Sequence, residues 1–453
     1  MIRKMARKTG TQVTRREFLK GASTALAVGT AVGTGLAPRR LRAQGQTAPP
    51  SERILLAFIG VAGRGSALIN DFKRLPESVI TDVCDVYRPH AEAAREMAGG
   101  QAAVYSDFRR LLEKTRADAV VIATPPHWHP LLSIAAMEAG KDVYCEKPMC
   151  LRPDEGVAML RTMQKTGRVT QLGTQIHAGE NFRRVVEIVR SGLLGKITAV
   201  RTIVTLNEFP GRLGNVPDSD PPGGLDWDLW LGPLPKRPFN RALFESGGHR
   251  YFRACVGSWV NELGPHIMDL AFWAMDPGIP RSARASGGRF ALQDVSDIPD
   301  TVEMLFEYPD FTMTFSHTAA NGYNFGFGQE PDRGRRLMVL FHGTRGTLAA
   351  DYGSYRLFLE DGTAGDVKLP EPSIPRSPGH QKEFLDAIKT RQQPPCNFQY
   401  HLPLAIAIGM GHAALFSGEK ITWDAQRQRV AGPRPAVAEA TSRYRAPWQL
   451  PRV

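Results

Sequence analysis

Apolar and polar residues follow two different patterns along the chain, and the first begins at residue 53. Residues 66–75, 129–139 and 153–166 place apolar side chains on one helical face, which predicts amphipathic helices. The apolar runs around them are short and nearly continuous, which is typical of buried parallel strands; they lie at 54–61, 79–86, 118–124, 142–146 and 169–173. Strands and helices that alternate in this way predict a doubly wound parallel α/β sheet over residues 52–175.

The second pattern starts after residue 175. A stretch rich in Pro and Gly lies at 210–224. Runs in which apolar and polar residues alternate lie before it at 197–207 and after it at 301–308, 311–318 and 336–342. We therefore expect an α+β domain over residues 176–430, with a large, mainly antiparallel open sheet. The helices predicted to flank this sheet lie at 263–275, 379–390 and 402–417. Residues 431–453 are rich in Pro and Arg, and we expect a tail that wraps the surface.

Residues 1–43 differ from both patterns. They hold ten Lys or Arg residues and one acid, and 15-RREFLK-20 precedes a mildly apolar run at 21–37 that is too weakly apolar to predict a membrane span. The pattern resembles a twin-arginine (Tat) export signal with cleavage near Ala43. This resemblance implies recognition by the Tat machinery, folding before export, and a periplasmic or extracellular location. A disordered basic tail and an uncleaved anchor are the alternatives.

The net charge of +12 over 453 residues does not indicate a nucleic-acid partner. Outside residues 1–43 the chain has 47 basic and 44 acidic residues, a net charge of +3, so most of the basicity belongs to the leader. Hydrophobic residues at 42% and charged residues at 23% are typical of a globular protein. The five cysteines are odd in number and have no paired close spacing, so they predict neither a disulfide framework nor a zinc site.

The segment 60-GVAGRGSALI-69 follows the first predicted strand and opens a predicted helix, which is the context of a dinucleotide phosphate loop. Gly60 would make the tight turn, Gly65 would let helix and strand pack closely, and the helix N-terminus would offer N–H groups to a pyrophosphate. The middle position of the fingerprint, where glycine is usual, holds Ala62. The candidate phosphate contacts are Gly60, Ala62, Gly63, Arg64 and Gly65.

Asp85 stands twenty residues after Gly65, at the end of the second predicted strand. A carboxylate there accepts hydrogen bonds from the ribose hydroxyls and repels a 2′-phosphate, so the sequence favours NAD over NADP. Arg88 nearby weakens this preference. The alternative is that Asp85 is only a turn residue.

Three further motifs follow predicted elements: 121-VIATPPHWH-129, 144-YCEKP-148 and 258-SWVNELGPHIMD-269. Together with the glycine loop they resemble the Gfo/Idh/MocA family of sugar and polyol oxidoreductases. The resemblance covers nearly all of the chain after the leader, and 226-DWDLWLGPLPKRP-238 resembles the exported branch of that family. It implies a Rossmann domain followed by an α+β domain, and it implies NAD as cofactor. The open antiparallel sheet of this family commonly forms an interface, so we also expect a homo-oligomer.

The resemblance also implies the site residues. Because the carboxyl ends of parallel strands meet at one edge of a sheet, the nicotinamide crevice is expected to hold Thr124, Pro125, His129, Glu146 and Lys147. Lys147 would hydrogen-bond the reacting hydroxyl, and His266 would be the general acid/base. In relatives an Asp stands four residues before this His, where this chain has Glu262. The expected catalytic set is Lys147, Glu262, His266 and Asp269.

Three points remain open at this level. Glu262, His266 and Asp269 share a face if one helix contains them all, but Gly264-Pro265 is a plausible helix start that would free Glu262. In His127-Trp128-His129 two His are close, but no third ligand has supporting spacing, so no metal is expected. Some aromatic residues are either sugar-stacking platforms or core residues, namely Trp227, Trp230 and Tyr251.

The expected function is an NAD-dependent oxidoreductase acting on a secondary hydroxyl of a sugar, polyol or glycoside. Free NAD is scarce outside the cytoplasm, so an exported enzyme would retain its cofactor tightly. The first alternative is a redox-neutral NAD-dependent glycosidase, which oxidises, eliminates, adds water and reduces in one cycle. The second is a non-catalytic carbohydrate-binding protein on a dehydrogenase scaffold.

Overall fold

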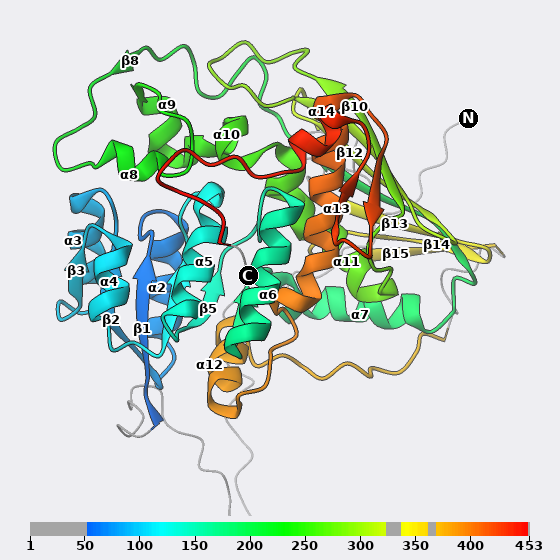
Figure 1. Cartoon of the computed structure of the whole chain (residues 1–453). Coiled ribbons are helices and arrows are strands. Elements are labelled where there is room, and N and C mark those ends of the chain that lie inside the picture. The colour runs from blue at the N-terminus through cyan, green and yellow to red at the C-terminus, as the bar shows by residue number, and fades with distance from the viewer. Residues whose placement is uncertain (1–51, 323–336, 361–367, 452–453) are drawn as a thin grey trace, which may run out of the picture. The chain divides into compact units, whose positions relative to one another are not determined.

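The computed structural model of the chain describes residues 52–322, 337–360 and 368–451 (Figure 1). The predicted export signal at 1–43 lies outside these ranges. Within them, the structure contains no helix with the length and hydropathy that a membrane crossing requires.

The first sheet is parallel and has six strands in the order β3-β2-β1-β4-β5-β6, which confirms the predicted doubly wound sheet. Every residue of β4 is buried, as its uninterrupted apolar sequence predicts, and every residue of β5 is buried too, including its first residue, Asp142. The pattern did not predict β3, which has only three residues. The strands are β1 (Ile54–Ile59), β2 (Ser78–Cys84), β3 (Ala103–Tyr105), β4 (Ala119–Ile122), β5 (Asp142–Cys145) and β6 (Thr170–Leu172).

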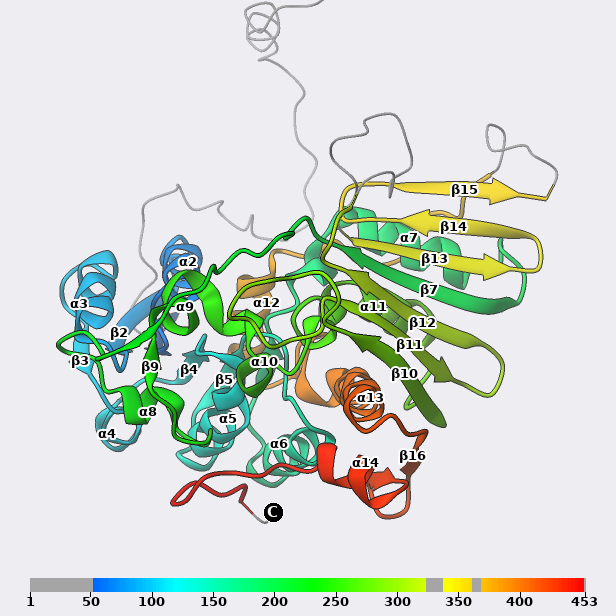
Figure 2. The ribbon, with the colours of Figure 1, turned by 90° about the horizontal axis from the view of Figure 1, so that it is seen from above.

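Helices connect these strands and cover the sheet (Figures 1 and 2). In α2 the side chains of Leu68, Ile69 and Phe72 are fully buried, because their spacing places them on one face that packs against β1 and its neighbours. The helices of this half are α2 (Arg64–Lys73), α3 (Arg88–Met97), α4 (Phe108–Lys114), α5 (His129–Glu138) and α6 (Pro153–Thr166).

A helix from far along the chain completes this first core. We expected residues 379–390 to flank the antiparallel sheet, and that prediction is wrong: α12 (His380–Thr390) buries Phe384 among residues of the parallel sheet and its helices. The Phe384 ring lies 6.4 Å from that of Phe72 and 5.8 Å from that of Tyr144, both edge to face. Helical periodicity shows which face of α12 is apolar, but not which sheet this face covers.

The second sheet has nine strands in the order β15-β14-β13-β7-β12-β11-β10-β16-β17. Its neighbours are antiparallel except β7 and β12, which run parallel, so the predicted α+β domain with a mainly antiparallel sheet is confirmed. The strands are β7 (Ile197–Thr205), β10 (Ser282–Gly288), β11 (Thr301–Glu307), β12 (Thr312–Thr318), β13 (Leu337–Gly343), β14 (Gly346–Ala350), β15 (Tyr355–Leu359), β16 (Ile421–Asp424) and β17 (Arg429–Ala431).

Two long helices pack against this sheet, α11 (Trp259–Met275) and α13 (Phe398–Ser417), and α7 (Glu180–Arg190) packs on α11. Shorter elements lie between β7 and α11 and near the end of the chain. They are β8 (Asp218–Ser219), α8 (Trp227–Leu231), β9 (Phe239–Asn240), α9 (Arg241–Phe244), η4 (Glu245–Tyr251), α10 (Arg253–Val256) and α14 (Arg434–Glu439). Two short turns stand earlier in the chain: η2 (Pro126–Trp128) after β4 and η3 (Gln175–Ala178) after β6.

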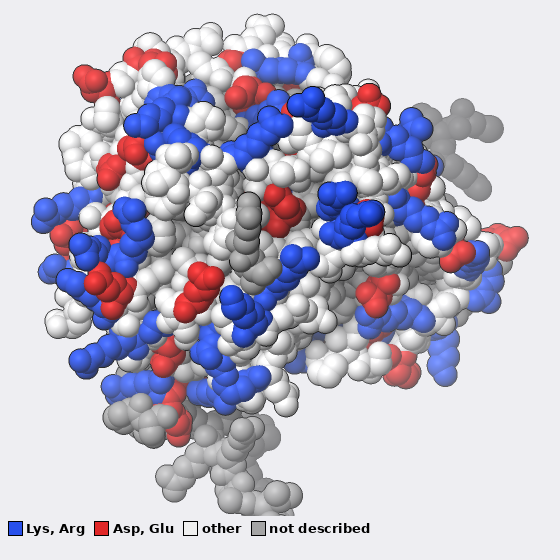
Figure 3. All heavy atoms as spheres, viewed as in Figure 1, with Lys and Arg blue, Asp and Glu red and all other residues white. Residues whose placement is uncertain are grey.

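Acidic and basic side chains are interspersed on the face of the molecule drawn in Figure 3. The five cysteines, all within the described part of the chain, are buried and free. Beyond α14, residues 442–450 cross the surface of the first half, as Figures 1 and 2 show in dark red. Folding thus brings three separate parts of the chain to the carboxyl edge of the parallel sheet: its own loops, residues 224–262, and the chain's last described residues.

Candidate active site

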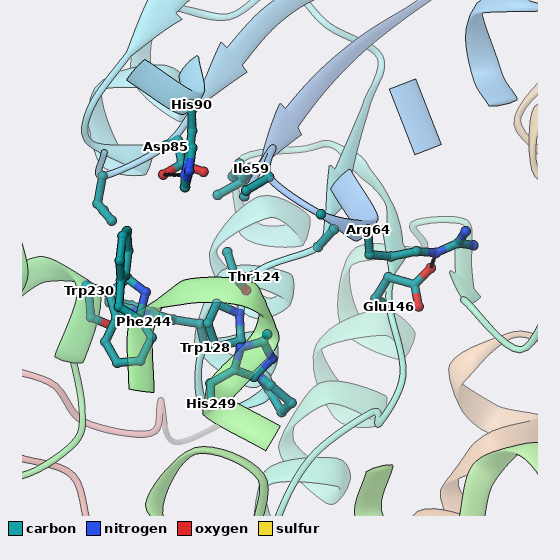
Figure 4. A pocket seen from close by; sticks show the side chains of 18 of the residues that line it. Ile59, Arg64, Asp85, His90, Thr124, Trp128, Glu146, Trp230, Phe244 and His249 are labelled. Carbon is teal, nitrogen blue, oxygen red and sulfur yellow. Dashed lines mark hydrogen bonds and ion pairs between the residues drawn. The ribbon is translucent and has the colours of Figure 1, made fainter. Parts of the chain in front are cut away.

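A cavity of about 760 Å³ opens where the strands of the parallel sheet end (Figure 4). One wall consists of the loops after β1, β2, β4 and β5, and the opposite wall comes from residues 229–262 of the second half. This volume is typical of a cofactor or small-molecule site. The expected contacts that do line it are Gly60, Ala62, Gly63, Arg64, Asp85, Thr124, Pro125, Glu146, Lys147 and Glu262.

The glycine loop has the geometry that a pyrophosphate requires. Gly60 has φ +77°, and an added Cβ would lie 2.7 Å from the backbone nitrogen of Thr124; a Cβ at Gly65 would overlap the carbonyl oxygen of Gly60. Gly63, at the N-cap of α2, has φ +43° and open space around it. Among the described residues, no group accepts from the N–H of Ala62 or Gly63. These donors and the helix N-terminus fit an anionic diphosphate.

Asp85 both closes a turn and faces the cavity. Its Oδ2 accepts from the N–H of Val61 at 3.0 Å, its Oδ1 accepts from the N–H of Tyr87 at 3.0 Å, and His90 Nδ1 lies 3.6 Å from Oδ1 (Figure 4). Each carboxylate oxygen has a second lone pair, which remains able to accept from a ribose hydroxyl. The turn role that the sequence left as an alternative is therefore present together with the cavity position.

The segment after β4 contributes a polar group that has no protein partner. Thr124 lines the cavity, and its buried Oγ1 makes no hydrogen bond within the described structure, so it is available to a bound group. His129 does not line the cavity. It is buried at 1% exposure, and its ring nitrogens lie 2.7 Å from the carbonyl oxygen of Pro148 and 2.9 Å from that of Thr124. His129 therefore holds two loops together behind the site.

Arg64 and Glu146 form an ion pair across the loop ends (Figure 4). Arg64 Nε donates to Glu146 Oε1 at 2.7 Å. Burial lowers the pKa of the Arg64 guanidinium, but the adjacent Glu146 carboxylate raises it more, so the net shift is upward. The carboxylate packs against Gly173, where an added Cβ would lie 2.7 Å from the carboxyl carbon. The pair fixes the loop after β5 against the start of α2.

Lys147 and Glu262 meet inside the cavity. Lys147 Nζ donates to Glu262 Oε1 at 2.8 Å and to the Glu262 carbonyl oxygen at 3.0 Å, and the Lys147–Pro148 peptide bond is cis. Arg250 Nε lies 3.2 Å from the same Glu262 oxygen. Burial raises the pKa of Glu262, but the charges of Lys147 and Arg250 lower it by more than burial raises it. The pKa is therefore below its ordinary value, and the carboxylate is charged.

Glu262 and His266 both belong to helix α11. It runs unbroken from Trp259 to Met275 with Pro265 inside, so Glu262 and His266 lie on consecutive turns of one helix. His266 is partly exposed and lies outside the cavity lining; its ring centroid is 6.0 Å from that of Tyr352. Burial first, and then the charge of Lys147, lowers the pKa of His266 to about 3, so the imidazole is neutral.

The structure places Asp269 away from the cavity, in a fully buried cluster. Its Oδ2 lies 2.8 Å from His177 Nε2, and Tyr400 donates to its Oδ1 at 2.9 Å. The His177 ring stacks on Trp273 with centroids 4.0 Å apart. Burial raises the pKa of Asp269, but His177 and His401 lower it more, and the carboxylate raises the pKa of His177 well above its ordinary value. Asp269 thus fixes α11 against its neighbours.

Several residues of the opposite wall were not expected. The cavity lining includes Phe244, and His249 and Arg250 of η4. Figure 4 shows Phe244 and His249. Burial, the largest influence, lowers the pKa of His249 to about 4. In the sequence they stand in 244-FESGGHRYF-252, and only the Gly-Gly pair signals an unusual turn there, where Ser246 and Gly247 have positive φ.

The structure places the three aromatic residues whose role the sequence left undecided, and sugar stacking stays a prediction. Trp230 lines the cavity and stacks on Trp227, with centroids 4.7 Å apart and planes at 16°. Tyr251 is a core residue, 6% exposed and edge to face with Trp259. In the described part of the chain, no group of three or more His, Cys, Asp or Glu side chains could hold a metal ion.

Residues 54–174, which form the parallel sheet and its phosphate loop, match the family described as "Oxidoreductase family, NAD-binding Rossmann fold", GFO_IDH_MocA. The chain carries the NAD-binding domain of the Gfo/Idh/MocA oxidoreductases. NAD is therefore the cofactor that the glycine loop, Asp85 and Thr124 fit.

Proteins with similar sequences match about two fifths of the chain. The "Alpha-N-acetylgalactosaminidase" of Shewanella oneidensis is 29% identical over 201 residues, 40% of this chain and 44% of the relative. A "Glycosyl hydrolase family 109 protein" of Solibacter usitatus is 31% identical over 204 residues, 41% of this chain and 44% of the relative. The chain thus matches less than half the length of these relatives.

Solved structures share the fold of both halves. The WlbA dehydrogenase of Bordetella pertussis, in complex with NADH and UDP-GlcNAcA, has a TM-score of 0.61 at 17% identity over 82% of this chain and 99% of that one. The aldose-aldose oxidoreductase of Caulobacter crescentus, complexed with glycerol, has a TM-score of 0.59 at 18% identity over the same shares. At these identities the likeness establishes the fold.

Proposed function

We propose that this protein oxidises a secondary hydroxyl of a sugar, polyol or glycoside with NAD that it retains between turnovers. The observation that carries the proposal is the position of Lys147. Its ammonium group lines the same cavity as the dinucleotide loop and is held there by Glu262 at 2.8 Å. The WlbA dehydrogenase and the aldose-aldose oxidoreductase, which share the fold, are supporting comparisons.

Each residue would have a distinct role. Bound NAD would accept the hydride, and the chain's own groups would handle the proton and the orientation of the substrate. Lys147 would donate a hydrogen bond to the reacting hydroxyl. The resemblance gives His266 the role of general acid/base, and this role requires the imidazole, which lies outside the cavity lining, to reach the hydroxyl when substrate is bound. Glu262 is charged and contacts Lys147, so we assign it the positioning of Lys147. Asp269 would position His266 through α11.

A redox-neutral glycosidase is the second candidate, and the similarity to an α-N-acetylgalactosaminidase favours it. Oxidation of one sugar hydroxyl to a ketone acidifies the neighbouring C–H. Loss of that proton expels the glycosidic oxygen as an alcohol, water adds to the resulting double bond, and reduction of the ketone restores the hydroxyl. Lys147 and His266 would serve this cycle as they serve simple oxidation.

The first experiment is to denature the purified protein and identify any released nucleotide by mass spectrometry. Near-stoichiometric NAD supports retention, whereas NADP would contradict the role assigned to Asp85. The holoprotein is then incubated with a panel of sugars and glycosides. Accumulated reduced nicotinamide with a ketone or lactone product indicates an oxidoreductase; a released sugar without net reduction indicates a glycosidase. A protein that binds no added NAD would favour the non-catalytic carbohydrate-binding alternative.

We also propose export through the Tat pathway and a homo-oligomeric state. The support for export is the 15-RREFLK-20 pattern within the basic leader. A variant with Arg15→Lys and Arg16→Lys should stay in the cytoplasm when cell fractions are compared. If this variant is exported like the wild type, the leader is not a Tat signal. Light scattering on the purified protein gives the number of subunits.

A further inference from the structure

Residues 442–450, which we call the C-terminal strap, are attached to the first half of the protein by side chains as well as by backbone. The N–H and Oγ of Ser442 donate to Asp154 Oδ2 at 2.9 and 2.6 Å, and Tyr444 donates to Glu155 Oε1 at 2.9 Å. Both acceptors are in the first turn of α6. The composition of this tail predicted that it wraps the surface, and these bonds define its path there.

Arg445 then anchors the strap to the loop that follows α8. Its side chain donates five hydrogen bonds, to the carbonyl oxygens of Asp228, Gly232 and Leu234 and to the Asp228 carboxylate, at distances from 2.8 to 3.2 Å. Its own N–H donates to the Pro233 carbonyl oxygen at 2.9 Å. The guanidinium is only 15% exposed. One side chain thus joins Asp228, Gly232 and Leu234.

That loop and the strap enclose a residue of the cavity wall. Trp128 lines the cavity, and its Nε1 donates to the Trp230 carbonyl oxygen at 3.0 Å. An added Cβ at Gly232 would overlap the Trp128 ring, so the loop rests directly on it. From the strap, the Trp448 ring lies edge to face with Trp128 at 4.8 Å. It also lies 6.2 Å from Phe108, which lines the cavity as well.

The same part of the second half closes the end of the cavity where Asp85 lies. The N–H of Arg88 donates to the Gly224 carbonyl oxygen, and the N–H of Asp226 donates to the Val86 carbonyl oxygen, both at 3.0 Å. These bonds pair residues 224–226 with the segment that directly follows Asp85. Farther along, the ring of Phe244 lies 5.6 Å from that of Tyr87 and 6.0 Å from that of His90.

We propose that the C-terminal strap is a latch that slows release of the bound dinucleotide. On this proposal, release requires residues 229–250 to move away from the loops of the parallel sheet, because these residues form most of the opposite wall of the cavity. In the strap, Arg445 bonds residues 228–234 next to that wall, and Trp448 packs on Trp128 of the first half. The start of the strap is bonded to α6 of the first half, so the strap joins the two sides of the cavity. The inference rests on the proposed retention of NAD and assigns that property to positioning residues outside the cavity.

The test measures exchange of bound nucleotide rather than turnover. Holoprotein is mixed with isotopically labelled NAD, and the label on protein separated from free nucleotide is followed by mass spectrometry. Arg445→Ala and Trp448→Ala should each raise the exchange rate by about tenfold or more, because changes of this kind act mainly on the dissociation rate. Arg443→Ala is the matched control: Arg443 is exposed and makes no hydrogen bond within the described structure. Trp448→Phe, which keeps an aromatic edge, should exchange at an intermediate rate.

The outcomes separate the latch from the proposed function. If wild type holds its label while folded Arg445→Ala and Trp448→Ala hold it equally well, the latch is wrong and retention stands. If wild type itself exchanges as fast as the variants, retention fails at its first step. Circular dichroism verifies that each variant folds. If Arg445→Ala does not fold, Arg445→Lys replaces it, because Lys keeps the charge and loses the forked hydrogen bonds. Wild-type exchange rates in both Arg445→Lys and Trp448→Phe would also overturn the latch.

Discussion

At the scale of single residues, Glu262 connects the two walls of the cavity. Its carboxylate contacts Lys147 at 2.8 Å and Arg250 at 3.2 Å, so one anion links the loop after β5 to η4. An Asp at this position, as the sugar-dehydrogenase relatives are expected to have, is one methylene shorter. With the longer side chain, this protein holds the segment that carries His249 and Arg250 against its Lys147.

Replacement of Lys147 by Met tests its role, because Met keeps the length of the side chain and removes the ammonium group. We expect single-turnover reduction of the bound nicotinamide to fall by roughly 10²–10⁴-fold, the usual contribution of a positioned proton donor or acceptor. NAD content should be unchanged, and Arg250 still compensates the charge of Glu262. The exposed Lys165 provides the control, Lys165→Met, with no expected loss. Normal turnover in Lys147→Met would favour a carbohydrate-binding protein.

At the scale of elements, α12 shows that the two halves of the fold are not separate along the chain. The apolar face of this helix belongs to the core of the parallel sheet, although more than two hundred residues separate it from β6. The side chain of Arg391, directly after α12, adds an ion pair with Asp142 at the start of β5. A fragment that ends near residue 175 would leave the faces of Phe72 and Tyr144 exposed.

Phe384→Ala measures this contribution. Phe384 is fully buried, so its truncation should lower the free energy of unfolding by about 3–5 kcal/mol, as large-to-small changes of buried aromatic residues do. The measurement is urea denaturation followed by circular dichroism. In Phe358→Ala, where the ring is 53% exposed in β15, the change should stay within about 0.5 kcal/mol. Equal effects of the two substitutions would mean that α12 does not stabilise this core.

At the scale of the whole molecule, the histidines make stability depend on pH. Burial is the main cause that lowers the pKa of seven of them to about 3 or 4: His127, His249, His266, His317, His380, His401 and His412. In the unfolded chain they titrate near pH 6.5. The unfolded state therefore binds more protons as the pH falls below about 6.5, and the stability that these neutral imidazoles contribute above that pH is lost. His177, whose pKa is raised beside Asp269, acts in the opposite direction.

We expect the free energy of unfolding to decrease steadily between pH 7 and pH 5, by up to about 1.4 kcal/mol per pH unit for each of these histidines. Urea denaturation across this range gives the slope. His412→Asn removes one buried imidazole that is not part of the cavity lining, and it should reduce the slope by the contribution of one histidine. A free energy that does not change between pH 7 and pH 5 would show that these imidazoles are not neutral in the folded protein.

The sequence predicted the parallel sheet and the residues at its carboxyl edge because strand periodicity and the glycine loop are local signals. It also indicated Lys147 and Glu262, but the contact between them depends on how α11 approaches the first sheet. His249 and Arg250 were missed for the same reason, because they reach the cavity from a segment whose own pattern is that of a turn. Trp448, which packs on Trp128 from outside the cavity, was missed because it stands in a surface tail. The seven residues of β10, SARASGG, contain little apolar alternation, so this strand was also missed.

The path of the C-terminal strap has a consequence for the order of synthesis. Residues 442–450 leave the ribosome after every other residue that forms the cavity and its walls, so Trp128 lacks its Trp448 neighbour throughout earlier translation. During that interval a folded nascent chain presents the dinucleotide loop with its outer support missing. If the strap acts as the proposed latch, the dinucleotide would load faster before the strap docks than afterwards.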